Sequence, residues 1–86
     1  MLTGSIDPNT KIESRRLVAA LRKLDPHLGS SVVDSLVIWL KDAGLDLEDV
    51  TKAFSLNEVE VALTKIFGDH MARLLREELE VALKDE

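Results

Sequence analysis

The sequence has 86 residues, of which 45% are hydrophobic and 31% charged, and a formal net charge of −5. This length allows a single domain, and the absence of cysteine excludes a disulfide framework and a cysteine-ligated metal site. Neither an apolar run of membrane-spanning length nor a signal segment occurs. The composition favours helices. We therefore expect a cytoplasmic all-α protein, a compact bundle of four to five short helices over residues 10–86, behind a flexible lead at residues 1–9.

The first helix is predicted from Lys11 to about Leu24. Thr10 and Glu13 have the spacing of a capping box, in which each side chain bonds a backbone N–H of the other residue. The helix should end before Pro26, because a residue that precedes proline is disfavoured in the α region.

A second helix is predicted from Ser31 to about Asp42, and Gly44 can supply the left-handed residue that ends it. Its apolar face is wider than one stripe, which is typical of a central helix. That face consists of Val32, Val33, Leu36, Val37, Trp39 and Leu40. Ile38 is the exception, since it lies on the polar side.

A short third helix is predicted over Leu47–Phe54, with Asp46 as its cap. Its inward residues would be Leu47, Val50 and Phe54. Ser55 and Glu58 form a second capping box, which opens a fourth helix at Leu56.

The fourth helix has regular three-to-four spacing of its apolar residues, which are Leu56, Val59, Leu63, Ile66 and Phe67. Gly68-Asp69 either ends this helix and begins a fifth or bends one long helix. The last helical segment runs from His70 to about Lys84. Its inward residues would be Met71, Leu74, Leu75, Leu79, Ala82 and Leu83.

Charge is distributed unevenly along the chain. Residues 1–24 carry a net charge of +3, whereas residues 25–86 carry −8. The basic residues of the first helix, which could steer an acidic partner, are Arg15, Arg16, Arg22 and Lys23. The overall acidic balance argues against non-specific binding to duplex DNA, which depends on neutralising phosphates.

No pattern of catalytic residues stands out. The chain has no cysteine or tyrosine, its two histidines (His27 and His70) lie in different connections, and no glycine-rich phosphate loop is found. The glycine within the acidic stretch 42–49 is misplaced for a calcium-binding EF-hand. We therefore expect a protein that is not an enzyme and that has no cofactor and no metal.

Residues 43–68 resemble a helix-turn-helix. Leu47–Phe54 would be the first helix, Ser55-Leu56 the turn and Asn57–Phe67 the recognition helix, so a divergent nucleic-acid-binding regulator over Leu47–Phe67 is the alternative function. The first residues of that recognition helix include Glu58 and Glu60, and carboxylates facing phosphates repel them. We therefore do not expect a nucleic-acid partner.

The tripeptide Asp34-Ser35-Leu36 resembles the attachment site of acyl carrier proteins, in which the serine bears a phosphopantetheine arm. The resemblance covers three residues, and it implies a carrier domain modified at Ser35. In that family the serine opens a helix, whereas here Ser35 falls inside one. This is the least favoured of the three functions.

Three apolar residues lie off the apparent core stripes: Ile38, Val61 and Val81. Single exposed apolar residues are ordinary, but three of them on so small a domain indicate a surface for another protein or for a second copy. We therefore expect a protein–protein docking or regulatory module that acts through helix faces, with the four basic residues and these three apolar residues as its partner-binding set.

Overall fold

The computed structural model describes residues 6–24, 26 and 29–84. It confirms the predicted fold class, a small all-α bundle, and adds one short antiparallel strand pair. The elements are β1 (Ile12–Glu13), α1 (Ser14–Arg22), α3 (Ser30–Asp42), β2 (Ala53–Phe54), α4 (Leu56–Phe67) and α5 (Asp69–Lys84). In the part of the chain that the structure describes, no helix is long and apolar enough to cross a membrane.

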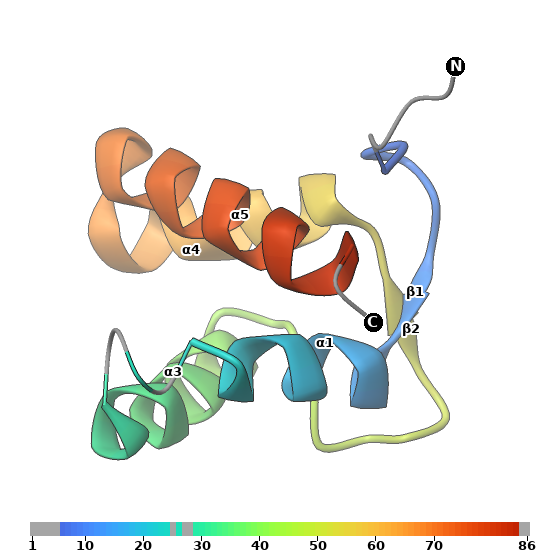
Figure 1. Ribbon diagram of the computed structural model, residues 1–86, viewed down its shortest axis with the longest axis horizontal. Helices are drawn as coiled ribbons and strands as arrows, with labels where there is room; N and C mark the ends of the chain where they lie inside the picture. Colours follow the sequence, from blue (N-terminus) through green and yellow to red (C-terminus); the bar gives the residue numbers. More distant parts are fainter. Residues whose placement is uncertain (1–5, 25, 27–28, 85–86) are drawn as a thin grey trace.

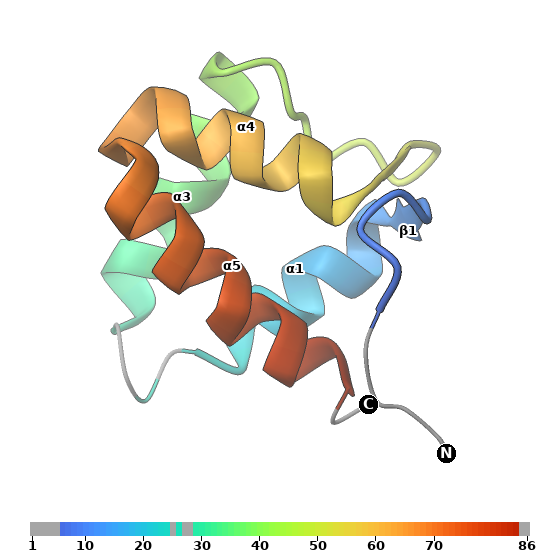
Figure 2. The ribbon, with the colours of Figure 1, turned by 90° about the horizontal axis from the view of Figure 1, so that it is seen from above.

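The helices form two layers. Figure 1 shows α4 and α5 side by side in one layer and α1 and α3 in the other. The two layers meet where α5 packs on α1 and α4 packs on α3. Seen from above in Figure 2, the α4–α5 pair lies over the other two helices.

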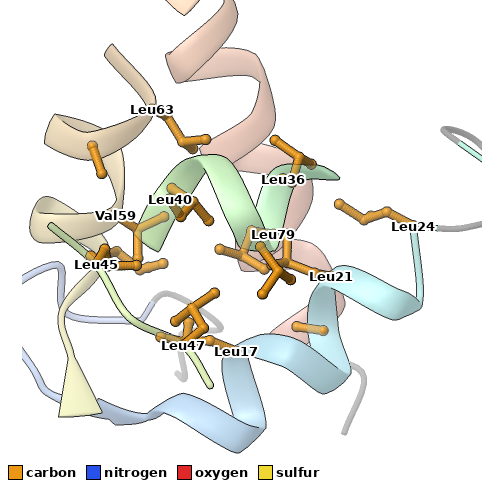
Figure 3. Close-up of a cluster of buried hydrophobic side chains, with 14 of the residues drawn as sticks. Leu17, Leu21, Leu24, Leu36, Leu40, Leu45, Leu47, Val59, Leu63 and Leu79 are labelled. Carbon is orange, nitrogen blue, oxygen red and sulfur yellow. The ribbon is translucent and has the colours of Figure 1, made fainter. Parts of the chain in front are cut away.

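A core of leucines holds the layers together. Side chains from all four helices converge on it, as Figure 3 shows, and Leu45 and Leu47 join them from the loop after α3. Its most deeply buried large members are Leu17, Leu36, Leu40, Leu56 and Leu79. Each such side chain contributes about 1.5–3 kcal/mol by leaving water, so the core supplies most of the driving force for folding.

The start of α1 differs from the prediction. The capping box of Thr10 and Glu13 does not form, because Ile12 and Glu13 extend as β1 and pair with Phe54 and Ala53 of β2. α1 begins at Ser14, three residues after the predicted start at Lys11, and Glu13 makes no side-chain cap hydrogen bond. Ile12 is buried in the core. The extended conformation therefore places an apolar side chain inside at the cost of a capping interaction.

The predicted third helix, Leu47–Phe54, is wrong. Residues 47–52 form turns, and the last two residues are β2. Two aspartates explain the difference, because their carboxylates accept hydrogen bonds from the backbone two residues on. Asp46 Oδ1 accepts from the amide of Glu48 (3.1 Å), and Asp49 Oδ1 accepts from the amide of Thr51 (3.0 Å). Such Asx turns compete with helical hydrogen bonds.

Ser14 attaches this loop to α1. Its side-chain hydroxyl donates to the backbone carbonyl of Asp49 (2.8 Å), and its backbone amide donates to the carbonyl of Lys52 (3.0 Å). Ser14 is fully buried although it is polar. The attachment sets the direction of the neighbouring residues: Leu47 points inward as predicted, whereas Val50 points into solvent, contrary to the prediction.

The other helix boundaries mostly follow the sequence. Gly44, at a φ of 99°, follows the end of α3, and the amide of Leu45 donates to the carbonyl of Leu40 (2.8 Å). Ser55 and Glu58 form the predicted capping box. Gly68, at a φ of 87° and a ψ of 171°, separates α4 from α5, so the stretch from Leu56 to Lys84 is two helices and not one. This backbone region is essentially restricted to glycine.

Besides Val50, four residues predicted to face the core are substantially exposed: Val32, Trp39, Met71 and Leu74. The buried residues of α5 are Ala72, Leu79, Ala82 and Leu83, of which the last three were predicted and Ala72 was not.

The predicted flexible lead lies partly outside the described residues. Its described part, residues 6–9, contacts the start of α4, where the amide of Asn57 donates to the carbonyl of Pro8 (3.0 Å) and its side chain donates to Asn9 Oδ1 (2.7 Å).

Replacing Ser14 by alanine should lower the free energy of unfolding by about 1–2 kcal/mol, because the carbonyl of Asp49 loses its donor in a partly buried place. Urea denaturation measures this change. The matched control is Ser31→Ala, at an exposed position on α3, which should change stability by less than about 0.5 kcal/mol. Equal effects of the two substitutions would contradict the role given to Ser14.

The stability of the fold should fall in acid. Hydrogen bonds from Lys11 and from the Ser55 amide lower the pKa of Glu58, and bonds from Thr51 lower that of Asp49. A carboxylate whose pKa is depressed in the folded state stabilises the fold above its unfolded pKa, and this contribution is lost as pH falls through the folded value.

Unfolding free energies measured at intervals from pH 7 to about pH 3 test this expectation. Glu58→Gln keeps an oxygen that can accept from the Ser55 amide but loses the charge, so its stability should depend less on pH than that of the unchanged protein. Glu77→Gln, at an exposed position on α5, is the control. A pH dependence of Glu58→Gln equal to that of the unchanged protein would contradict the assignment.

Candidate functional site

A groove of about 550 Å³ lies between α1, α3 and the loop that joins α3 to β2. We call it the α1–α3 groove. Its apolar lining consists of Val18, Val37, Ile38, Leu47 and Val50, and its charged lining consists of Arg15, Arg22, Asp34 and Glu48. An apolar floor with charged edges is the composition expected of a surface that other molecules contact.

Helical spacing builds two walls of this groove. Arg15, Val18 and Arg22 are separated by three and four residues, so they lie on one face of α1. Asp34 and Ile38 are likewise one turn apart on α3. The groove thus lies between this face of α1 and this face of α3.

The loop supplies the third wall. Leu47 is buried and anchors the loop in the core, whereas Val50 is 70% exposed. The exposed fraction of Ile38, on the α3 wall, is 59%. Two β-branched apolar side chains therefore reach solvent from different walls of one groove.

The electrostatics of the groove are mixed. Arg22 pairs with Asp34 across the groove (Nη1 to Oδ1, 3.4 Å), and Arg15 pairs with Glu13 (Nη2 to Oε2, 3.4 Å). Glu48 pairs with Lys41 at 3.7 Å. The basic residues of α1 are thus partly complemented within the chain, and they do not form a uniformly positive face.

The groove brings together three of the seven predicted partner-binding residues: Arg15, Arg22 and Ile38. Arg16 lies elsewhere on α1, and Lys23, which follows the end of α1, donates to the carbonyl of Ala82 on α5 (3.2 Å).

The remaining two predicted residues, Val61 and Val81, are each 58% exposed. They belong to α4 and α5, in the other layer of the bundle. Their exposure is as predicted, but the groove does not include them. That any of the seven residues binds a partner remains a prediction.

Sequence reasoning missed two features of the surface. One is the loop wall with Val50, since a helix was expected there. The other is a second hollow of about 570 Å³ beside Trp39, Ile66 and Phe67. The Trp39 and Phe67 rings meet edge to face, with centroids 5.8 Å apart. The tryptophan was assigned to the core, but it lies at the edge between α3 and α4.

The structure does not support a helix-turn-helix over Leu47–Phe67, because its first helix is replaced by turns and β2. Ser35 lies within α3 and is half-buried, away from the start of the helix. Among the described residues, no group of three or more histidines and carboxylates is placed to hold a metal ion.

The fold and the groove define a small all-α bundle with an exposed, partly apolar groove on its α1–α3 layer. In comparisons with known proteins, no protein-family model matches the chain, and neither a curated protein nor a solved structure shows significant similarity to it.

Proposed function

We propose that this chain is a non-enzymatic docking module that binds a protein in the cytoplasm through the α1–α3 groove. The observation that carries the proposal is the exposure of Ile38 and Val50 above an apolar floor. Covering these two side chains should contribute about 1–2 kcal/mol each to binding, scaled from the value for full burial of an aliphatic side chain.

The chemistry of the groove favours a protein partner over a nucleic acid. Asp34 and Glu48 line the same groove as the two arginines, and they would repel phosphates. An amphipathic segment could instead cover the apolar floor and pair its own charges with the edges, as in helix-in-groove recognition.

The lining also argues against catalysis and against a small-molecule site. Among the described residues that line the groove there is no histidine, serine, cysteine or tyrosine, and its two carboxylates, Asp34 and Glu48, are each paired with a basic side chain. Sites for small molecules enclose most of their ligand, whereas Ile38 and Val50 are more than half exposed at the edges of this groove.

Photo-crosslinking tests the proposal. Benzoylphenylalanine is placed at Val50 in the full chain, produced in the organism that encodes it, and at Met71, an exposed residue of α5 outside the predicted partner-binding set, as the control. Irradiation should give discrete protein adducts from position 50 and not from position 71. Adding Ile38→Asp should reduce the yield from position 50 at least about tenfold, which corresponds to 1.4 kcal/mol.

Two results would contradict the proposal. One is the same set of adducts from both positions, which would indicate random encounters. The other is a set of adducts from position 50 that Ile38→Asp leaves unchanged, which would show that the groove is not the contact.

A further inference from the structure

The charged residues of the α1–α3 groove are divided between its walls. Arg15 and Arg22 lie on the α1 wall. Asp34 lies on the α3 wall, and Glu48 lies on the loop. The groove therefore has a basic side on α1 and an acidic side on α3 and the loop, and Ile38 and Val50 are exposed on this second side.

From this division we propose that a second copy of this chain covers the groove with its own α1–α3 face, in a two-fold symmetric dimer. The inference rests on the proposed function and names the partner of that site. A two-fold axis that runs along the groove, between its two sides, places the basic side of each copy over the acidic side of the other. Ile38 and Val50 of each copy then cover the α1 side of the other, which includes Val18.

Other protein occupants fit the charges less well. A uniformly acidic segment would satisfy Arg15 and Arg22 but face Asp34 and Glu48, and a uniformly basic segment would have the opposite conflict. Like charges placed together across an interface are unfavourable. A partner with both signs in matching positions avoids the conflict, and a second copy has them by symmetry.

The ion pairs within the chain do not prevent these charges from pairing with a second copy. Arg22 and Asp34 pair at 3.4 Å, with side chains 55% and 62% exposed. Exposed pairs of this kind contribute about 0–1 kcal/mol, so their charges can turn to a second copy at little cost. Lys41 adds one positive charge beside Glu48, at 3.7 Å, but it does not line the groove.

The size of the groove bears on the strength of the dimer. Nine residues line it, fewer than the roughly 20–30 per partner of a standard interface, so the dimer should be weak. The dimer should be in rapid exchange with monomer and depend on concentration by mass action.

Light scattering coupled to size exclusion measures the solution mass at loading concentrations about thirtyfold apart. The mass should rise toward twice 9.6 kDa at the higher concentration. Ile38→Asp should remain a monomer at both concentrations, whereas Met71→Asp, at an exposed position on α5, should dimerise like the unchanged chain.

Charge reversal gives the sharper test. A chain with Arg15→Glu and Arg22→Glu has two acidic sides, and a chain with Asp34→Lys and Glu48→Lys has two basic sides. Each should be monomeric alone, and the mixture should form a heterodimer of about twice 9.6 kDa. The control reverses Arg73 and Glu77 on the outer side of α5 and should dimerise normally. Circular dichroism verifies that each variant keeps its helicity.

A folded unchanged chain that stays monomeric at both concentrations overturns the dimer. So does a dimer that Ile38→Asp and the charge reversals leave intact, because it must use another face. If the chain is monomeric but position 50 crosslinks to a different protein, the second copy is wrong and the docking function stands. If the chain is monomeric and position 50 gives no specific adduct, both proposals fail.

Discussion

The buried Ser14 is the constraint on which the groove depends. Its hydroxyl and amide hold the carbonyls of Asp49 and Lys52 against the start of α1. The β1–β2 pair continues the same attachment outward. Without these bonds the apolar contacts of Ala43, Leu45 and Leu47 would hold the loop between α3 and β2 to the core. With them, Val50 is fixed beside Ile38, and a depression between two helices becomes a three-walled groove.

The helices could be predicted from the sequence because their signals are local. The Ser55–Glu58 capping box and the Gly44 terminus depend on residues within one turn of one another, and both occur as predicted. The segment 47–54 could not be predicted in this way. Its spacing of apolar residues is helical, but Asx turns and a hydrogen bond to Ser14, thirty-five residues away, determine its conformation. The loop wall of the groove could not be predicted for the same reason, because its position depends on this hydrogen bond between distant residues.

The candidate site was accessible to sequence reasoning only in part. Ile38 could be found because it breaks the polar side of its helix, and the arginines because they cluster on α1. Their meeting in one groove depends on how α1 packs on α3, which is a property of the tertiary structure. The basic cluster also looked more positive in the sequence than it is in the fold. Asp34 is twelve residues from Arg22 in the sequence and comes close to it only in the folded chain, whereas Glu13 already lies two residues from Arg15.

The most direct test of this account compares the solution mass of the unchanged chain with that of Ser14→Ala at one high loading concentration. Ser14 does not line the groove, so it can influence association only by holding the loop wall in place. We predict a dimer for the unchanged chain and a shift toward 9.6 kDa for Ser14→Ala, with helicity retained by circular dichroism. Equal masses for the two chains would contradict the claim that the loop held by Ser14 builds the docking surface.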